Sequence, residues 1–444
     1  MSKQFFGTDG VRGTVGEEPM TAEFALRLAS AASRVLAPDG GTVLIGKDTR
    51  LSGYMFESAL EAGFVAAGVD VMLIGPLPTP GIAMLTQELG ADFGVVISAS
   101  HNPFYDNGIK FFDGKGSKLS DDVERAIESQ LENPPTTRDS ASLGKATRVD
   151  SARVRYQDFC VSTFPASLTL DGLKIVFDGA NGAGYKVGPR ALADLGAQVI
   201  PIGCSPNGRN INDGCGSTQP ELLASTVPAV GADVGIALDG DGDRLVMIDE
   251  HGQVVDGDQL LYILAAARKQ DGQLNGPVVG TVMSNLGLEH ALGKLSIDFR
   301  RASVGDRYVL QTLRETGGTI GGETSGHMIV LDQTTTGDGL ICALQVLAVM
   351  KQSGKPLSEL AGGMSKYPQS LVNVRVSHKV DPTKSPAIRD AVAAAERKLM
   401  DTGRVVLRAS GTEPVIRVMV EGQDAAVVQD LARSLADVVA EAAR

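Results

Sequence analysis

The chain has 444 residues, of which 43% are hydrophobic and 21% are charged, and its formal net charge of −12 corresponds to a sequence pI near 5.0. This length exceeds what one hydrophobic core serves and predicts several domains. The acidic balance argues against nucleic acid as a partner, because a phosphate backbone is bound through a basic surface.

The amino-terminal residues 1–7 contain no apolar signal core, and no stretch reaches the roughly 20 apolar residues of a membrane span. The four cysteines are scattered without a Cys-x-x-Cys pair, which disfavours a disulfide framework and a zinc site. We therefore expect a cytoplasmic protein with reduced, mostly buried thiols and no membrane partner.

Three segments repeat the order strand, turn, helix, strand. We expect them at residues 42–45, 54–67 and 69–74, then at 173–177, 185–195 and 198–202, and then at 278–282, 286–294 and 297–301. This repetition predicts similar α/β domains built from βαβ units.

Shifts in composition indicate where the domains end. Residues 133–149 lose the apolar periodicity and resemble a linker, and further boundaries fall near residue 251 and at 365–370. The last segment is expected to hold strands at 371–376, 405–407 and 415–420 and helices at 385–400 and 424–443. We predict domain I at 1–150, domain II at 151–251, domain III at 252–366 and a smaller C-terminal α+β domain IV at 367–444.

The first motif is the stretch from Val95 to Phe104, in which an apolar run ends at Ser100. Residues 95–97 indicate a buried strand, and Asn102-Pro103 blocks a helix, so we expect Ser100 on an ordered loop at a strand end. Active sites of α/β proteins lie at such ends. A plain surface turn is the alternative for this motif taken alone.

The second motif is the loop Asp239-Gly240-Asp241-Gly242-Asp243-Arg244, which lies between expected strands at 234–238 and 245–248. The alternate spacing and the glycines let three carboxylates converge, which suits Mg²⁺. An EF-hand loop is excluded, because Arg244 stands where that loop needs glycine and the flanks are strands. An acidic hairpin turn is the remaining alternative, disfavoured because adjacent carboxylates repel without a cation.

Two further loops carry groups that suit a phosphosugar. Residues 320–329 include Glu323, Ser325 and His327, which can form hydrogen bonds with sugar hydroxyls or shuttle a proton. A turn without a binding function fits this stretch equally well. Residues 408–417 form a tight turn between strands, and its amides, hydroxyls and guanidinium groups resemble a phosphate cradle. The cradle comprises Arg408, Ser410, Gly411, Thr412 and Arg417.

The glycine-rich turn at residues 7–13 adds Thr8 and Arg12 as candidate substrate-binding residues, and Lys110 lies ten residues past Ser100. From the residues alone, an ordinary turn and a solvated lysine are the simpler interpretations. A phosphorylated Ser100 with three aspartates would place a charge of about −5 beside one Mg²⁺. Arg244, Lys110 and His101 are the candidates that offset it.

In this order, the four motifs resemble those of the α-D-phosphohexomutases over the whole chain. Ser-Ala-Ser-His-Asn-Pro resembles the family's phosphoserine loop, Asp-Gly-Asp-Gly-Asp-Arg its metal loop, Gly-Glu-Thr-Ser-Gly-His its sugar loop and Arg-Ala-Ser-Gly-Thr-Glu-Pro its phosphate loop. The resemblance implies three similar mixed-sheet α/β domains and a smaller C-terminal domain around a central cleft.

By the same resemblance, Ser100 is the phosphoserine and holds Mg²⁺ together with Asp239, Asp241 and Asp243, while Lys110 and His327 are proton carriers. Glu323 and Ser325 would bind sugar hydroxyls, and the 408–417 loop the distal phosphate. A sugar bisphosphate is the expected activator. The oligomeric state stays open, with a homodimer as the expected form.

Residues 98–99 and 303–309 resemble the branch of the family that acts on glucosamine phosphates, although Thr324 stands where that branch has Gln. The implied reaction converts glucosamine 6-phosphate into glucosamine 1-phosphate, a precursor of cell-wall amino sugars, through a bisphosphate. The rivals are a mutase for glucose or mannose phosphates, a Mg²⁺-dependent phosphatase and a phosphosugar sensor.

Overall fold

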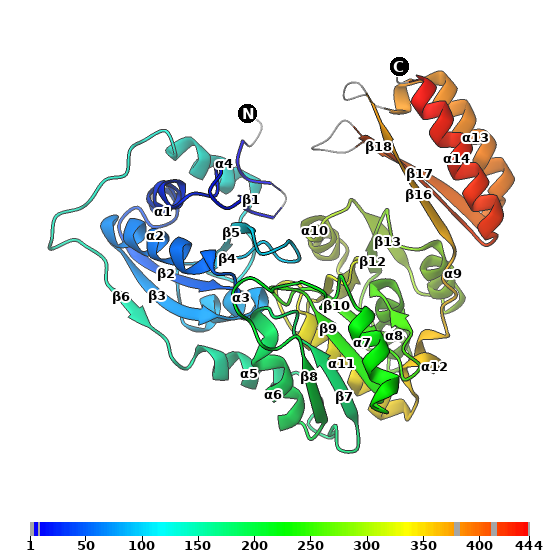
Figure 1. Cartoon of the computed structure of the whole chain (residues 1–444), viewed down its shortest axis with the longest axis horizontal. Helices are drawn as coiled ribbons and strands as arrows, with labels where there is room; N and C mark the ends of the chain where they lie inside the picture. Colours follow the sequence, from blue (N-terminus) through cyan, green and yellow to red (C-terminus); the bar gives the residue numbers. More distant parts are fainter. Residues whose placement is uncertain (1–3, 8, 377–381, 410–414, 443–444) are drawn as a thin grey trace.

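The computed structural model describes residues 4–7, 9–376, 382–409 and 415–442. Figure 1 shows three sheets with their helices in an arc and a fourth, separate unit at its carboxyl end. The predicted fold class is confirmed, because three α/β domains with mixed sheets precede a smaller domain with an antiparallel sheet. In the described part of the chain, no helix has the length and apolar character to cross a bilayer.

Domain I is built on a six-stranded sheet of order β1-β5-β4-β2-β3-β6. Its strands β2, β3, β4 and β6 run parallel, β5 pairs antiparallel with β4, and the edge strand β1 pairs antiparallel with β5. The elements are β1 (Val11–Thr14), α1 (Ala22–Leu36), β2 (Gly41–Lys47), α2 (Ser52–Ala66), β3 (Val69–Pro76), α3 (Thr79–Glu88), β4 (Phe93–Ile97), β5 (Asp106–Asp113), α4 (Asp121–Gln130) and β6 (Ala146–Arg148).

Domain II has a five-stranded sheet of order β11-β10-β9-β7-β8, in which β8, β7 and β9 are parallel. Its elements are α5 (Ala152–Ser162), β7 (Lys174–Asp178), the short η1 (Ala183–Tyr185), α6 (Val187–Asp194), β8 (Gln198–Ile202), α7 (Glu221–Ala229), β9 (Val234–Leu238), β10 (Leu245–Ile248) and β11 (Val254–Val255).

Domain III has a four-stranded sheet of order β13-β12-β14-β15, in which only β15 is antiparallel to its neighbour. Its elements are α8 (Gly257–Gln270), β12 (Val278–Thr281), α9 (Leu286–Lys294), β13 (Phe299–Ala302), α10 (Asp306–Thr316), β14 (Ile320–Gly322), β15 (Met328–Val330), α11 (Gly339–Ser353) and α12 (Leu357–Ala361).

Domain IV has a three-stranded antiparallel sheet of order β16-β18-β17, and α13 and α14 cover one face of it (Figure 1). Its elements are β16 (Gln369–Arg375), η2 (Pro382–Lys384), α13 (Pro386–Leu399), η3 (Met400–Thr402), β17 (Gly403–Ala409), β18 (Val415–Gly422) and α14 (Ala425–Ala442).

Alternate residues of the central strands pack into different cores, as the two-residue period of a strand requires. On β2, Val43 and Ile45 join a core beneath α1 and α2, whereas Leu44 joins a large core that continues through domains II and III. Domain IV buries its apolar residues in a core of its own. Domains I to III are therefore one packed body, and domain IV is a separate one.

The three repeated βαβ units are confirmed, since β2 and β3, β7 and β8, and β12 and β13 each pair in parallel. The segment expected as a linker differs in part from the prediction. Residues 132–145 are mostly exposed coil, but β6 follows and extends the first sheet along β3. Edge strands are half solvated, so their polar sequences resemble coil.

The three sheets share one topological feature that positions the site. In each sheet, a parallel strand is followed directly by an antiparallel partner, and the connection between them is a predicted motif loop. These connections are β4 to β5 with Ser100, β9 to β10 with the aspartates, and β14 to β15 with residues 323–327. The loops thus lie at equivalent strand ends.

Candidate active site

Ser100 lies where the sequence predicts, on the loop after β4, and its side chain meets domain II. Ser100 Oγ donates a hydrogen bond to Asp239 Oδ2 at 2.5 Å and lies 3.4 Å from His101 Nδ1. The residue is only 2% exposed and adopts a φ of 52°, which costs a non-glycine residue free energy. Surrounding contacts must hold this conformation.

Two side chains that the sequence analysis did not identify supply those contacts. Arg50 Nη2 donates to the carbonyl oxygens of Ser100 and Asn102 at 3.1 and 2.5 Å. From domain II, Asn212 Nδ2 donates to the same two oxygens at 2.9 and 3.1 Å. Arg50 is fully buried and pairs with Asp48. The serine loop is thus clamped from both domains.

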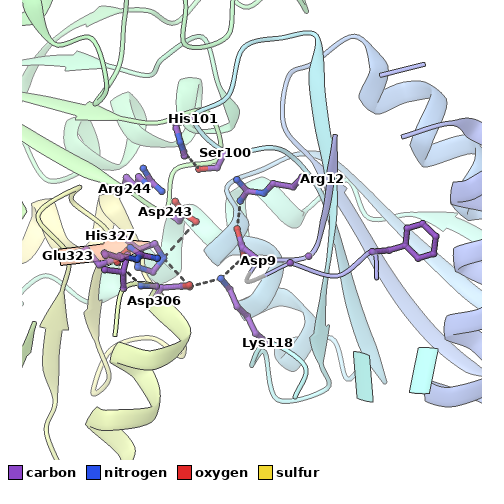
Figure 2. A pocket seen from close by; sticks show the side chains of 16 residues that line it. Asp9, Arg12, Ser100, His101, Lys118, Asp243, Arg244, Asp306, Glu323 and His327 are labelled. Atoms are coloured by element: carbon purple, nitrogen blue, oxygen red, sulfur yellow. Dashed lines mark hydrogen bonds and ion pairs between the residues drawn. The ribbon is translucent and has the colours of Figure 1, made fainter. Parts of the chain in front are cut away.

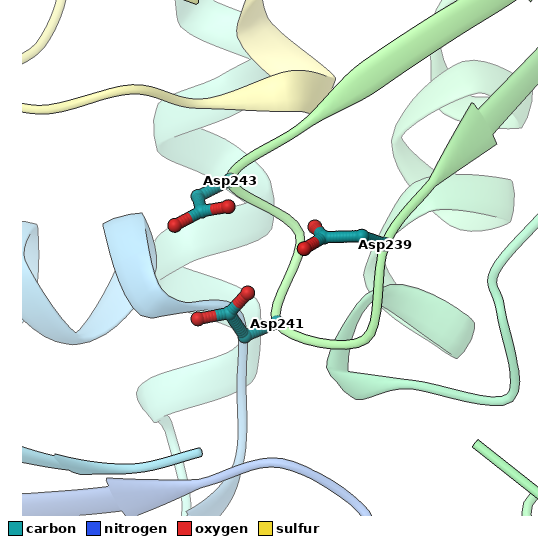
Figure 3. A group of neighbouring side chains, drawn as sticks. All are labelled: Asp239, Asp241 and Asp243. Atoms are coloured by element: carbon teal, nitrogen blue, oxygen red, sulfur yellow. The ribbon is translucent and has the colours of Figure 1, made fainter. Parts of the chain in front are cut away.

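The carboxylates of Asp239, Asp241 and Asp243 converge as predicted, with one oxygen of each within 4.8 Å of the others (Figure 3). All three side chains are buried. Asp241 Oδ1 and Asp243 Oδ1 have no hydrogen-bond partner among the described residues. Buried carboxylate oxygens without donors fit a hard cation such as Mg²⁺, which prefers oxygen ligands.

The pKa values of the three aspartates reflect their burial and their mutual repulsion. Burial, reinforced by Asp243 and Asp241, raises the pKa of Asp239 well above its usual range. Burial and then Asp241 likewise raise the pKa of Asp243. Burial also opposes ionisation of Asp241, but the charge of Lys110 outweighs it and lowers the pKa. The cluster therefore requires positive charge to be fully ionised.

Lys110 supplies part of that charge, and its interpretation as a solvated lysine is wrong. It is 1% exposed, and its Nζ lies 2.8 Å from Asp241 Oδ2, 2.9 Å from Asp9 Oδ2 and 3.8 Å from Asp243 Oδ2. Burial alone would lower the pKa of Lys110, but these carboxylates raise it above its usual range. Lys110 is therefore a cation at neutral pH that offsets part of the carboxylate charge.

The metal loop and the loop of domain III are joined through their backbones. Arg244 and His327 form an isolated antiparallel bridge, and Leu245 N donates to Gly326 O at 3.0 Å. A Cβ on Gly326 would lie 2.0 Å from Leu245 O, and the residue has a φ of 88°, so this close approach requires glycine. His327 Nε2 consequently lies 3.8 Å from Asp243 Oδ2.

A cavity of about 450 Å³ opens where the loops meet, a size typical of small-molecule sites. Residues from all four domains line it, and most of them are labelled in Figure 2. The lining residues are Phe5, Gly7, Asp9, Gly10, Arg12, Ser100, His101, Lys118, Asp243, Arg244, Val304, Gly305, Asp306, Glu323, His327 and Arg408.

His101 faces this cavity in its neutral form. Burial lowers the pKa of His101 to about 4, and the positive charges of Arg244 and Arg12 act in the same direction. The imidazole is therefore uncharged at neutral pH, with one ring nitrogen beside the Ser100 hydroxyl. The lowered pKa makes this ring a weaker base than a free histidine.

A chain of polar contacts crosses the cavity from domain I to domain III. In Figure 2 it runs from Arg12 through Asp9 and Lys118 to Asp306 and His327. Burial opposes the charge of Lys118, but Asp306 and Asp9 outweigh it and raise its pKa. Sequence reasoning did not identify Lys118 or Asp306 as site residues, because no local motif marks a single lysine or the first residue of a helix.

The residues predicted to bind sugar hydroxyls differ in their positions relative to the cavity. Glu323 lines the cavity, and its Oε1 accepts a hydrogen bond from Gly305 N at 2.9 Å. Ser325 is exposed and is not among the lining residues. Thr324 Oγ1 donates to the buried carboxylate of Asp258 at 2.8 Å.

The two predicted phosphate-cradle arginines stand opposite each other in the sheet of domain IV. Arg408 on β17 pairs with Arg417 on β18, so both side chains are on the same face, and both are exposed. Arg408 lines the cavity. Thr8, Ser410, Gly411 and Thr412 lie outside the described residues.

Comparison with family models assigns the whole architecture. The models for phosphoglucomutase/phosphomannomutase alpha/beta/alpha domains I, II and III match residues 3–138, 155–252 and 256–367, and the model for the C-terminal domain matches 371–438. Together they span most of the chain in a single order.

Individual relatives match the sequence of this chain over nearly their full length. The chain is 56% identical over 443 residues to a phosphoglucosamine mutase of Aeromonas salmonicida, covering 100% of both chains. It is 57% identical over 441 residues to one of Nitrosococcus oceani, covering 99% of this chain and 98% of the relative.

Solved structures share the fold at lower identity. A phosphoglucomutase/phosphomannomutase family protein of Burkholderia thailandensis superposes with a TM-score of 0.82 at 23% identity, covering 100% of this chain and 98% of the other. The N-acetylphosphoglucosamine mutase of Aspergillus fumigatus, in complex with GlcNAc-6P and magnesium, gives 0.69 at 17% identity, covering 100% and 96%.

Proposed function

The chain belongs to the phosphoglucomutase/phosphomannomutase family, the α-D-phosphohexomutases, and we propose that it interconverts glucosamine 6-phosphate and glucosamine 1-phosphate. As a phosphohexomutase it is an isomerase that moves a phosphoryl group between two oxygens of one sugar. The name of its full-length relatives supports the amino sugar as substrate. The structural observation that carries the proposal is the 2.5 Å contact of Ser100 Oγ with Asp239 Oδ2 beside the cavity.

Ser100 is the residue that carries the phosphoryl group in this proposal. Its hydroxyl donates to Asp239 of the aspartate cluster, and its backbone is fixed by the clamp of Arg50 and Asn212. Its phosphoryl group passes to O1 of glucosamine 6-phosphate, which releases its proton and becomes a bisphosphate. The bisphosphate turns over, and Ser100 Oγ then takes the phosphoryl from O6, which regains a proton.

Asp239, Asp241 and Asp243 would hold Mg²⁺ together with a phosphoryl oxygen of Ser100. The unpartnered buried oxygens of two of these residues support this assignment, as does the magnesium complex of the Aspergillus relative. A bound Mg²⁺ would supply charge neutralisation on the phosphoryl group in transfer. Arg244 and Lys110 add fixed positive charge on the same side.

Proton transfer is assigned to groups beside the serine. Two candidates are Lys110, which neighbouring carboxylates keep protonated, and His101, whose neutral ring lies beside Ser100 Oγ. His327, whose two ring nitrogens lack hydrogen-bond partners among the described residues, is the third candidate.

The remaining site residues bind the parts of the substrate that do not react. Arg12 and Glu323, which line the cavity, and Ser325 at its loop are assigned to the sugar and its hydroxyls. Arg408 and Arg417 are assigned to the distal phosphate, with Ser410, Gly411 and Thr412 as further donors by their place in the sequence, and Thr8 is assigned to the substrate without a named group. Both orientations of the bisphosphate must use this cradle.

The test compares turnover of glucosamine 6-phosphate with that of glucose and mannose 6-phosphates, with Mg²⁺ and a catalytic amount of glucose 1,6-bisphosphate. We expect the highest kcat/KM for glucosamine 6-phosphate and no stoichiometric free phosphate. Preference for glucose or mannose 6-phosphate would assign the other branch of the family. Phosphate released at the rate of substrate loss would indicate a phosphatase.

A cytoplasmic location and a homodimer complete the proposal. The bacterial phosphoglucosamine mutases that the chain resembles support the former, and light scattering after gel filtration measures the latter. The sugar bisphosphate is proposed as the reagent that first phosphorylates Ser100.

A further inference from the structure

We propose that Asp306 binds the 2-amino group of the sugar and so selects glucosamine 6-phosphate over glucose 6-phosphate. The inference rests on the proposed function, because it concerns how this cavity recognises that substrate. Asp306 is the first residue of α10 and lines the cavity from domain III. It belongs to residues 303–309. The proposed mechanism assigns this segment neither to the metal nor to a phosphate group.

The two sugars differ at C2 by a charge. Glucosamine 6-phosphate carries an amine that is an ammonium at neutral pH, whereas glucose 6-phosphate carries a neutral hydroxyl. A carboxylate binds an ammonium through a charge-assisted hydrogen bond, which is stronger than a bond to a hydroxyl. Among the described lining residues, four carry a carboxylate: Asp9, Asp243, Asp306 and Glu323.

Two of these four carboxylates already bind other groups. Asp9 places one oxygen against Lys118 and the other against Lys110 and Arg12. Asp243 belongs to the aspartate cluster that would hold the metal. Neither has an oxygen left for a substrate ammonium.

Asp306 does have a carboxylate oxygen available to a substrate ammonium. Its contacts to Lys118 Nζ and to His327 Nε2, the latter at 3.5 Å, are both made by Oδ2. In the described part of the chain Oδ1 has no hydrogen-bond partner, yet it is absent from the buried atoms that lack one, so it is accessible. Since the residue lines the cavity, Oδ1 is available to a donor there.

Position distinguishes Asp306 from Glu323. C2 is bonded to C1, so the amine lies next to the oxygen that receives the phosphoryl group from Ser100. The imidazole of His327 lies between the aspartate cluster and Asp306, with Nε2 3.8 Å from Asp243 Oδ2 and 3.5 Å from Asp306 Oδ2. Glu323 instead bonds Gly305 N, and no contact joins it to a metal-loop carboxylate among the described residues.

This placement has a kinetic consequence. When O1 faces Ser100, the amine lies near Asp306. When the sugar is turned so that O6 faces Ser100, C2 points to the other side of the ring and loses the contact. Asp306 should therefore favour phosphoryl transfer to glucosamine 6-phosphate and leave transfer to glucosamine 1-phosphate largely unaffected.

The experiment measures single-turnover loss of a radiolabelled phosphoryl group from Ser100, loaded from labelled glucose 1,6-bisphosphate. Wild type, Asp306→Asn and Glu323→Gln are each mixed with glucosamine 6-phosphate, glucose 6-phosphate or glucosamine 1-phosphate. For Asp306→Asn we expect a roughly 10- to 100-fold slower reaction with glucosamine 6-phosphate, the size of a charged hydrogen bond. With the other two sugars we expect changes within about threefold, since neither offers an ammonium in that place.

The matched variant tests which carboxylate is responsible. Glu323→Gln should slow the reactions with glucosamine 6-phosphate and glucose 6-phosphate in the same proportion, since both sugars share their other hydroxyls. If Glu323→Gln alone changes the ratio between them, the assignment to Asp306 is overturned. Equal slowing of all three reactions in Asp306→Asn would also overturn it, because that pattern is a structural effect.

A measurement on wild type keeps the proposal testable if Asp306→Asn does not fold. The kcat/KM ratio of glucosamine 6-phosphate to glucose 6-phosphate should fall as pH rises through the amine pKa, about 8 for such amines. A ratio that is flat across that range contradicts the inference. Wild type that does not isomerise glucosamine 6-phosphate at all would instead refute the proposed function.

Discussion

Ser100 Oγ and Asp239 Oδ2 lie 2.5 Å apart, although the residues belong to different sheets and are 139 positions apart in the chain. The contact joins the loop after β4 to the loop after β9. It places the hydroxyl at the edge of a carboxylate cluster whose ionisation burial opposes. The proposed nucleophile and the candidate metal site are therefore in direct contact.

Asp239→Asn should remove the charge of a proposed metal ligand and replace the carboxylate that accepts from the serine hydroxyl with a neutral amide oxygen. We expect turnover to fall by about 10²- to 10³-fold, the usual cost of losing one group that stabilises charge in a transition state. Calorimetric titration with Mg²⁺ should also show weaker binding. Asp298→Asn, an exposed aspartate in an ion pair with Arg300, is the control that should leave both quantities unchanged.

Arg50→Lys tests the clamp on the serine loop. Lysine keeps the charge but lacks the fork that donates to Ser100 O and Asn102 O. Misplacement of a reacting group by about 1 Å costs roughly 10²-fold, so we expect kcat to fall by 10- to 100-fold with KM nearly constant. The exposed Arg155→Lys is the matched control. A rise in KM with unchanged kcat would contradict a positioning role.

His101 should stay neutral across the physiological range. Because its pKa is lowered to about 4 in the folded state, its ring should titrate only as pH falls toward that value. The unfolded chain binds this proton more readily than the folded protein does. The free energy of unfolding should therefore decrease as pH falls from about 6.5 toward 4.

The protonation of His101 can be followed by NMR of the ring protons. The chain has five histidines, and the signal absent in His101→Gln identifies this one. A midpoint near 6.5 for that signal would refute the neutral form. In His101→Gln the loss of stability between pH 6.5 and 4 should be smaller than in wild type.

Arg417→Ala should weaken substrate binding more than it affects phosphorylation of Ser100. Arg417 stands opposite Arg408 in the domain IV sheet and is exposed, and no contact joins it to the serine loop among the described residues. We expect KM to rise by roughly tenfold or more, as for loss of one charged hydrogen bond. Phosphoserine content by intact mass should stay near the wild-type value.

Arg389→Ala is the control for Arg417→Ala, because Arg389 is exposed on α13 of the same domain. This control should change neither KM nor phosphoserine content. If Arg417→Ala lowers both quantities in equal measure, Arg417 does not have the binding role assigned to it.

The motif loops could be predicted from the sequence because each follows a continuous apolar strand. The runs ending at Ile97 and Leu238 have the composition of strands buried on both faces, and the polar residues that follow must lie at the sheet edge. The fold class follows from the same pattern repeated along the chain. That the three loops converge depends on how the sheets pack, which no local pattern encodes.

The residues that the sequence analysis did not identify are single side chains whose roles arise from contacts between segments far apart in the chain. Arg50 and Asn212 are both within bonding distance of Ser100 O but 50 and 112 positions from it in the chain. Lys118 meets Asp306 across 188 positions. An isolated arginine or lysine has no spacing that separates it from a solvated one, and only burial reveals the difference.

The most direct test of the central claim is the intact mass of wild type and of Ser100→Ala, measured together with formation of glucosamine 1-phosphate from glucosamine 6-phosphate. The account predicts that wild type gains the mass of one phosphoryl group after treatment with glucose 1,6-bisphosphate and turns over, and that Ser100→Ala does neither. Full activity in Ser100→Ala, or wild type that is neither phosphorylated nor active after that treatment, would contradict it.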